Sequence, residues 1–255
     1  VESDPSGHSL IKGVAGSGKT TIGIARAHFL KNNYCLDNDK ILFATYNKTL
    51  INYSKLLFKN FKPYEISFFE DQKVDMDLKT IDSIIAKLYY KYSSNKFKIV
   101  SNRELYKYLN KAISLVSNED YNEILDPKNK TFILNELNWI KSSGYIYKED
   151  YLTVDRLGRG SSTVKGPRRL MKNSDERRAI YSTLIELENL MKKDENITFS
   201  TMAIRVKDLL KNKKINNNIY KHIIVDESQD FSKVQLDIIS LLFDDTQKYS
   251  SIMFL

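Results

Sequence analysis

The stretch GVAGSGKTT, residues 13–21, constrains the fold more than any other part of the chain. The chain has nine glycines, and three of them fall between Gly13 and Gly18, directly before Lys19 and Thr20. The spacing is G-x4-G-K-T, which is the pattern of a phosphate-binding loop. A flexible glycine turn is the alternative, and it leaves the lysine and threonine unexplained.

The sequence around the loop has the context that such a loop needs, a strand before it and a helix after it. Residues 9–12 form a short apolar stretch, and residues 20–31 have a helical apolar pattern. Glycines let backbone N–H groups turn towards phosphate oxygens, and the helix N-terminus favours the same anion. We expect Lys19 to reach the β- and γ-phosphates and the Thr20 hydroxyl to ligate Mg²⁺. The expected nucleotide-binding residues are Gly13, Ala15, Gly16, Ser17, Gly18, Lys19, Thr20 and Thr21.

A second site is predicted where the apolar strand at residues 221–225 ends in two acids, Asp226 and Glu227. In parallel sheets, ligands bind at the carboxyl ends of the strands. We expect Asp226 to hold Mg²⁺, Glu227 to orient and activate a water molecule, and Gln229 to sense the γ-phosphate. Taken alone, the stretch also fits an acidic helix start.

The order of the elements predicts an α/β fold. We expect buried or partly buried strands at residues 40–45, 77–80, 221–225 and 251–255, with helices between them. Alternating strands and helices indicate a parallel sheet with helices on both faces. Helical patterns dominate residues 93–195, and this part is interpreted as an inserted helical subdomain. The main domain is therefore expected to be discontinuous, with residues 1–92 and 196–255.

The charge balance favours an anionic partner. Forty Lys and Arg residues against 32 Asp and Glu give a net charge of +8, which suits nucleic acid, although a Lys-rich genome bias explains part of it. Six of the nine arginines lie within residues 156–178. We expect phosphate contacts from Arg156, Arg159, Arg168 and Arg169, the alternative being an exposed loop with no ligand.

A further nucleic-acid contact is predicted after the strand at residues 40–45. Tyr46, Asn47 and Lys48 follow it at the same sheet edge. An aromatic ring and an amide there could stack on or bond to a single strand. A solvated helix start is the alternative.

Several classes of protein are not expected. The sequence has no run of about 18 apolar residues, so we do not expect a membrane helix. Residues 1–10 do not resemble a signal peptide. The single Cys35 excludes a disulfide framework within the chain and fits a reducing cytoplasm, where we expect the protein to act. No Cys and His spacing predicts zinc or an iron–sulfur cluster.

The two nucleotide motifs together resemble a known family. AGSGKT at residues 15–20 and VDESQD at residues 225–230 resemble the UvrD/Rep-like branch of superfamily 1 helicases. FATYNKTL at residues 43–50 resembles that family's motif Ia. TIDS at residues 80–83 resembles its T-x-H-[ST] element, with Asp82 in place of the histidine. Residues 197–203 resemble its D-F-x-D-M element with both acids replaced by threonine, so no chemistry is assigned to them.

The resemblance implies a RecA-like domain that binds ATP and Mg²⁺. It implies catalytic roles for Lys19, Asp226, Glu227 and Gln229, metal ligation by Thr20 and Asp226, and a nucleic-acid contact at Thr80. The implied activity is that of an ATP-dependent helicase on single-stranded DNA, in preference to RNA. The second RecA-like domain is missing from this sequence, so we expect a fragment that hydrolyses ATP poorly.

One other class of function stays open from the sequence. An ATP-gated interaction module, such as a subunit of a defence complex, would use the same nucleotide motifs without unwinding DNA. A P-loop kinase leaves the DESQD stretch and the long insertion unexplained.

Overall fold

The computed structural model describes residues 1–2, 5–14, 16–60, 75–156, 168–212, 214 and 218–255. The chain forms two compact units. We call Val1–Ser93 with Val206–Leu255 the sheet unit, and Ser94–Arg205 the helical unit. The first boundary lies one residue from the expected one, and the second lies within a helix, ten residues after the expected position 195.

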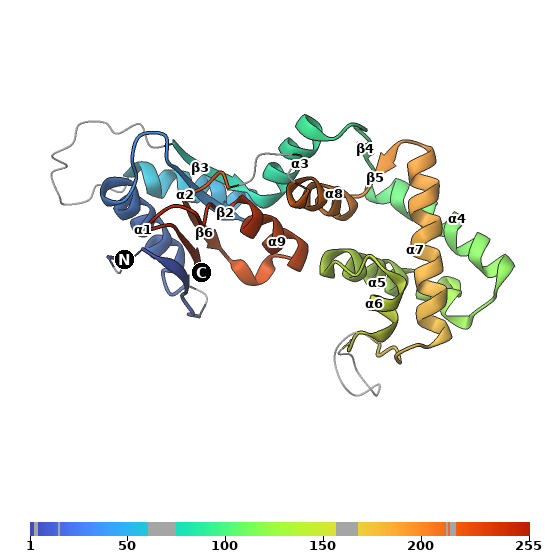
Figure 1. The fold of residues 1–255 in the computed structure, drawn as a ribbon. Helices are drawn as coiled ribbons and strands as arrows, with labels where there is room; N and C mark the ends of the chain where they lie inside the picture. The colour runs from blue at the N-terminus through green and yellow to red at the C-terminus, as the bar shows by residue number, and fades with distance from the viewer. Residues whose placement is uncertain (3–4, 15, 61–74, 157–167, 213, 215–217) are drawn as a thin grey trace. The chain divides into compact units, whose positions relative to one another are not determined.

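The sheet unit contains a five-stranded parallel sheet of strand order β1-β7-β6-β2-β3 (Figure 1). The strands are β1 (Gly7–Leu10), β2 (Lys40–Thr45), β3 (Asp75–Thr80), β6 (His222–Asp226) and β7 (Ser251–Phe254). The sequences of β2 and β6 are nearly continuous apolar runs, as expected for central strands covered on both faces. The predicted α/β fold with a parallel sheet is confirmed.

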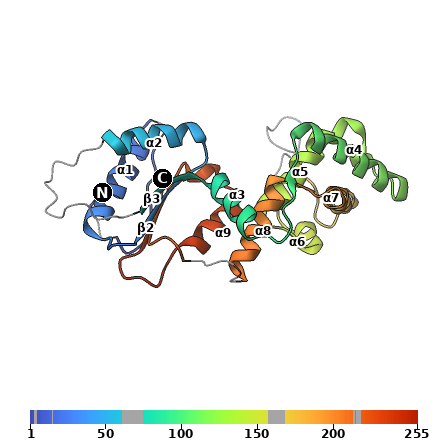
Figure 2. The same ribbon diagram turned by 90° about the horizontal axis from the view of Figure 1, so that it is seen from above.

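Helices cover both faces of this sheet. They are α1 (Lys19–Asn33), α2 (Lys48–Asn60), α3 (Ile81–Tyr92) and α9 (Lys233–Leu242), with the end of α8 (Phe199–Lys211). Figure 2 shows α1 and α2 on one side of the sheet and α9 on the other. Ile24 and Ala27 of α1 pack against Phe43, Ile224 and Met253 of three strands. This apolar contact fixes the start of α1 near the sheet.

The strand register brings three polar strand ends to one edge. Thr45 at the end of β2 pairs with Asp226 at the end of β6 on one side. On its other side Thr45 pairs with Thr80 at the end of β3. Residues that follow β2, β3 and β6 therefore leave the sheet at neighbouring positions, where parallel sheets bind ligands.

The helical unit has its own apolar core. Its elements are β4 (Lys98–Ile99), α4 (Asn102–Glu119), η1 (Glu123–Leu125), η2 (Pro127–Asn129), α5 (Lys130–Ser143), α6 (Lys148–Thr153), α7 (Asp175–Lys193) and β5 (Asn196–Ile197), with the start of α8. Leu109, Ile133, Leu137, Ile180 and Leu187 lie fully inside this core. Trp139 packs against it, as its apolar helical neighbours predict.

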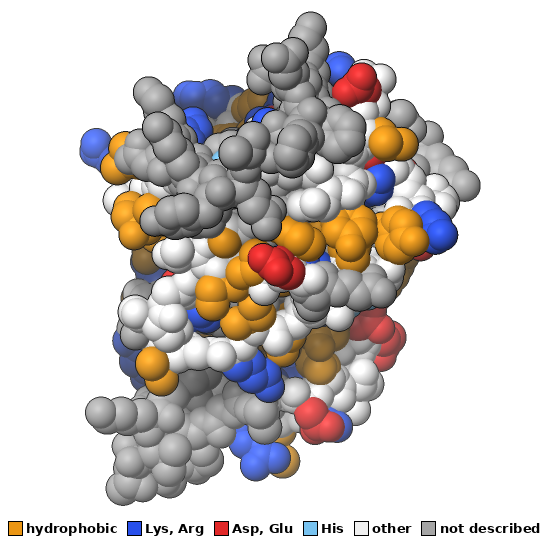
Figure 3. Space-filling model, turned by 90° about the vertical axis from the view of Figure 1, so that its left-hand side faces the viewer, with side chains coloured by type: hydrophobic (Ala, Val, Ile, Leu, Met, Phe, Trp, Pro, Cys, Tyr) orange, Lys and Arg blue, Asp and Glu red, His pale blue; other side chains and the backbone are white. Residues whose placement is uncertain are grey.

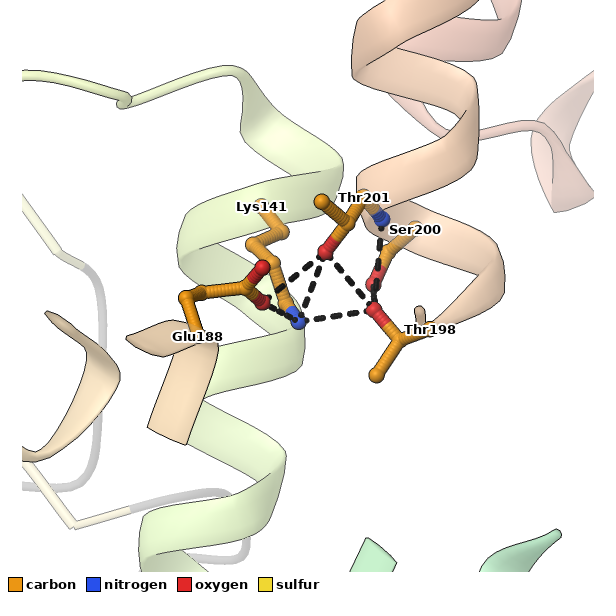
Figure 4. A network of polar contacts seen from close by, with 5 residues as sticks. All are labelled: Lys141, Glu188, Thr198, Ser200 and Thr201. Carbon is orange, nitrogen blue, oxygen red and sulfur yellow. Dashed lines mark hydrogen bonds and ion pairs between the residues drawn. The ribbon is translucent and has the colours of Figure 1, made fainter. Parts of the chain in front are cut away.

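A polar network joins three helices of the helical unit (Figure 4). The buried amine of Lys141, on α5, donates to Glu188 Oε1 of α7 at 2.9 Å and to Thr198 Oγ1 at 2.9 Å. It also lies 3.3 Å from Thr201 Oγ1, which donates to Glu188. The backbone N–H of Thr201 donates to Thr198 Oγ1, so the network also holds the first turn of α8. The two threonines that replace the acids of the family element therefore have a structural role.

The surface charge is not gathered into one patch on the face that Figure 3 displays. Lys and Arg side chains are scattered over its described part, and hydrophobic side chains form a band across the middle. The described part of this face therefore shows no single basic patch that would mark a nucleic-acid site. Within the described ranges, no helix has the length and apolar character needed to span a bilayer.

Candidate nucleotide site and nucleic-acid contacts

The predicted phosphate loop connects β1 to α1. Gly16 and Gly18 have φ angles of 78° and 81°, in the left-handed region that glycine adopts without strain. The Lys19 amine donates to the carbonyl oxygens of Gly13, at 3.1 Å, and Val14, at 3.3 Å. The lysine side chain therefore folds back over the loop. Ala15, one of the expected nucleotide-binding residues, lies outside the described part of the chain.

The start of α1 suits an anion. The first N–H groups of a helix have no partner within the helix, and Gly18, in the N-cap position, has no side chain that could bind them. No acidic residue occupies the first turn of α1. Ser17 and Thr21 are exposed on either side of this helix start. Backbone donors and the helix dipole can therefore act together on a phosphate group.

The two predicted Mg²⁺ ligands contact each other. Thr20 Oγ1 donates a 2.8 Å hydrogen bond to Asp226 Oδ2, and the other carboxylate oxygen accepts from the Glu227 N–H at 3.1 Å. Asp226 is fully buried. Burial raises the pKa of its carboxyl above the usual value, against the lowering effect of the Thr20 hydrogen bond. A hydroxyl and a carboxylate side by side fit the oxygen ligands that Mg²⁺ prefers.

The turn after β6 carries the other predicted catalytic residues. Glu227 has a φ of 52° and a ψ of 48°, a left-handed conformation that is uncommon for a residue with a Cβ. The Gln229 amide donates to the Glu227 carboxylate. Lys19, Glu227 and Gln229 line one pocket of about 350 Å³, together with Leu10 and Ile11. Three of the four predicted catalytic side chains therefore face a common space.

Ser228 fixes this turn, and the sequence analysis did not single it out. Its backbone N–H and its hydroxyl both donate to the Leu255 carbonyl oxygen, at 2.9 Å and 3.0 Å. The turn that bears Glu227 is thereby tied to the end of the neighbouring strand. The only feature of the sequence that could have indicated this role is a small hydroxyl residue between the acid and the glutamine.

The residues after β2 form a capped helix start. Asn47 Oδ1 accepts from the Thr49 N–H at 2.9 Å, so it caps the start of α2. Tyr46 is 47% exposed, and its ring centroid lies 6.3 Å from that of Phe231. Lys48 is exposed at the first position of α2. The segment is a helix start that also presents an aromatic ring to solvent, and its contact with nucleic acid stays a prediction.

The end of β3 is used within the sheet unit. Thr80 is buried, and its hydroxyl accepts from the Ser83 N–H at 3.2 Å as the N-cap of α3. Asp82, which stands where the family has a histidine, accepts a 2.9 Å hydrogen bond from the Gln235 amide of α9. Burial raises the pKa of the Asp82 carboxyl. The hydrogen bond between Asp82 and Gln235 joins α3 to α9. A nucleic-acid contact at Thr80 stays a prediction.

The arginine segment of the helical unit is partly internal. The guanidinium group of Arg156 pairs with the fully buried Glu136 at 2.6 Å and lies 4.3 Å from the centre of the Trp139 ring. Arg168 pairs with Glu176, and Arg169 is exposed. Arg159 lies outside the described residues.

The full chain matches a protein-family model. Residues 1–255 match the UvrD/REP helicase N-terminal domain. A similar protein is the ATP-dependent DNA helicase srs2 of Schizosaccharomyces pombe, which is 27% identical over 253 aligned residues. That alignment covers 93% of this chain and 26% of the relative. The chain therefore spans about a quarter of the length of that relative.

Proposed function

Because the chain belongs to the UvrD/REP helicase family and matches its N-terminal domain, we propose that it is the ATP-binding motor domain of a DNA helicase or translocase. In the full-length protein it would couple ATP hydrolysis to movement along single-stranded DNA. The observation that carries the proposal is the 2.8 Å contact between Thr20 and Asp226. It joins the phosphate loop to the acidic turn, and it thereby brings residues from both ends of the chain together.

Each residue of the site has a proposed role that follows from its chemistry. Lys19 would exchange its two carbonyl partners for the β- and γ-phosphate oxygens of ATP. Thr20 and Asp226 would hold Mg²⁺, which neutralises phosphate charge when it is bound. Glu227 would orient the attacking water and accept its proton. Gln229 would sense the γ-phosphate, and its hydrogen bond to the Glu227 carboxylate would couple it to the base.

Two features support single-stranded DNA as the partner. The relative that matches 93% of the chain is named an ATP-dependent DNA helicase. The exposed Tyr46 ring follows the strand next to the one that carries Asp226, so a stacked base would lie one strand away from the nucleotide site. A second RecA-like domain would come from the rest of the full-length protein, and we propose the cytoplasm as its compartment.

The proposal is tested by ATP hydrolysis of the full-length protein with and without single-stranded DNA. We expect strong stimulation by DNA and its loss in Lys19→Ala. Lys55→Ala is the matched control, since Lys55 is exposed on α2 and lies away from the pocket. Hydrolysis that is lost in Lys19→Ala but indifferent to DNA would support the ATP-gated interaction module instead. Full hydrolysis by Lys19→Ala would contradict the nucleotide site itself.

A further inference from the structure

The helical unit contains a second pocket, of about 630 Å³, whose lining is strongly basic. It lies between the end of α6 and the start of α7. Its charged lining residues are Asp155, Arg156, Arg168, Arg169, Lys172 and Arg177. Five of these six side chains are cations. A cleft lined mostly by one sign of charge attracts ligands of the opposite sign, so this pocket is a candidate anion site.

Three of the cations have carboxylate partners within the protein. The pairs are Arg156 with Glu136, Arg168 with Glu176, and Lys172 with Asp155. Only the first of these pairs is largely buried, because the Arg168 and Lys172 side chains are about half exposed. These pairs therefore account for three of the five positive charges, and they leave two.

Arg177 is the first cation without a carboxylate. Its side chain is 1% exposed. The guanidinium donates to the carbonyl oxygens of Tyr151, at 2.6 Å, Leu152, at 3.1 Å, Val154, at 2.9 Å, and Leu170, at 3.0 Å. No described carboxylate pairs with it, and its buried Nε has no hydrogen-bond partner among the described residues. The four carbonyl oxygens and the Tyr151 ring, whose centre lies 5.4 Å from the guanidinium carbon, stabilise this charge. They do not cancel it, so Arg177 adds to the positive potential of the pocket.

Arg169 is the second unmatched cation. It is exposed beside the pocket, and the described part of the chain offers it no carboxylate within ion-pair distance. The positive charges around the pocket lower the pKa of the Asp155 carboxyl below its usual value. The hydrogen bond from Lys172 lowers this pKa most, and the charges of Arg169 and Arg177 lower it further. Asp155 is the carboxylate in the pocket lining, but it pairs directly with Lys172, so neither Arg169 nor Arg177 has a described carboxylate partner of its own.

We propose that this pocket binds one phosphate group of a nucleic-acid backbone through the exposed Arg169, with the charge of the buried Arg177 adding to the attraction. Guanidinium groups match phosphate geometry and remain charged at all physiological pH values. A phosphodiester carries one negative charge. The two unmatched arginines can balance this charge while the described ion pairs stay intact. The choice of nucleic acid as the source rests on the proposed function, whereas the phosphate chemistry rests on the pocket.

The test uses the exposed arginine, because a change at buried Arg177 could unfold the unit. We would measure binding of a labelled oligothymidylate to the full-length protein over a range of salt concentrations. Arg169→Gln is expected to weaken binding by roughly threefold to tenfold and to reduce the slope of log K against log salt by about 0.7. Arg103→Gln is the matched control, since Arg103 is exposed on α4 of the same unit and does not line the pocket. It should change neither value.

Equal affinity and slope for Arg169→Gln and Arg103→Gln would overturn the pocket as a DNA contact. If that result came with normal DNA stimulation of ATP hydrolysis in the wild type, the proposed function would stand and only the pocket would fail. A wild-type protein that did not bind the oligonucleotide would overturn both.

A second measurement distinguishes backbone phosphate from free phosphate. The side-chain Nε–Hε signals of ¹⁵N-arginine-labelled protein would be followed during titration with the oligonucleotide and, separately, with inorganic phosphate. Signals that move with the oligonucleotide and are lost or unmoved in Arg169→Gln support the proposal. Movement with inorganic phosphate alone, with unchanged oligonucleotide affinity in Arg169→Gln, would keep the phosphate pocket and overturn nucleic acid as its source.

Discussion

Thr20 Oγ1 donates to Asp226 Oδ2 at 2.8 Å, across 206 residues of sequence. The hydroxyl belongs to the first turn of α1 and the carboxylate to the end of β6. Both groups carry the kind of oxygen atom that Mg²⁺ prefers as a ligand. The contact therefore marks the point where the phosphate loop and the acidic turn would act on one Mg²⁺ ion.

Removal of this hydroxyl should affect the metal-bound nucleotide most. In Thr20→Val the shape is kept, but Asp226 loses its side-chain donor and Mg²⁺ would lose a ligand. We expect affinity for ATP with Mg²⁺ to fall by roughly tenfold or more, as expected for about 1.4 kcal/mol or more of lost interaction. Affinity for ATP measured in EDTA should change much less.

Thr131→Val provides the control for this variant. Thr131 is exposed on α5 of the helical unit, so the same substitution there should leave nucleotide affinity unchanged. Equal losses of affinity for Thr20→Val with and without Mg²⁺ would show that the hydroxyl does not act through a metal ion.

Glu227→Gln should separate binding from hydrolysis. The variant keeps the size of the side chain and its position in the pocket, but it cannot accept a proton from water. We expect ATP hydrolysis by the full-length protein to fall by roughly 10²–10⁴-fold, the usual contribution of a general base. ATP affinity, measured with a fluorescent analogue, should stay within about threefold of the wild type, because the substitution leaves the binding of ground-state ATP unchanged. Hydrolysis at the wild-type rate would exclude Glu227 as the base.

Local sequence was sufficient for the elements with strong apolar patterns. The strand at Lys40–Thr45 and the sheet fold follow from short apolar runs. The two nucleotide motifs were placed together from the same reasoning, because parallel strands end at a common edge. A helix between the last two strands was expected without a residue range, although Ser232 and Gln235 form a capping box in front of an apolar run at the start of α9.

Other features could not be predicted because they depend on tertiary contacts. The strands β4 and β5 have two residues each, and they pair only because distant segments of the helical unit meet. Arg177 was counted as a surface cation within a cluster. Its burial depends on carbonyl groups from residues 151–154 and 170, which no local pattern predicts. The clustering of arginines in the sequence therefore does not distinguish the buried Arg177 from the exposed arginines near it.

His222 should make stability depend on pH. It is fully buried in β6, where Nδ1 lies 2.9 Å from Ser251 Oγ and Nε2 has no partner among the described residues. Burial lowers the pKa of this imidazole to about 4, and the charges of Lys221 and Arg26 act in the same direction. The unfolded chain, with a pKa of about 6.5, binds the proton more readily. The free energy of unfolding should therefore fall as the pH decreases from about 6.5 to about 4.

The expected loss from His222 is about 3 kcal/mol over that range. Urea unfolding at several pH values measures it, and His222→Gln should show a shallower dependence than the wild type. The difference between the two proteins isolates this residue from other titrating groups. Parallel pH profiles for the two proteins would show that His222 titrates equally in both states.

Lys141 should be the most sensitive lysine of the helical unit. Its side chain is 6% exposed, and it supplies donors to Glu188, Thr198 and Thr201 at the start of α8. Lys141→Met removes the charge and leaves Glu188 without its cation, so we expect the free energy of unfolding to fall by about 2–4 kcal/mol. Lys111→Met should change it by less than about 0.5 kcal/mol, because Lys111 is exposed on α4.

A double variant tests whether the ion pair or the packing causes this loss. In Lys141→Met with Glu188→Leu no unpaired carboxylate remains, and replacement of a buried pair by apolar groups is often neutral. We therefore expect chemical unfolding of the double variant to recover at least half of the stability lost in Lys141→Met. If the two losses were simply additive, the lysine would stabilise the unit through its methylene contacts and its hydroxyl partners, and not through the charge of Glu188.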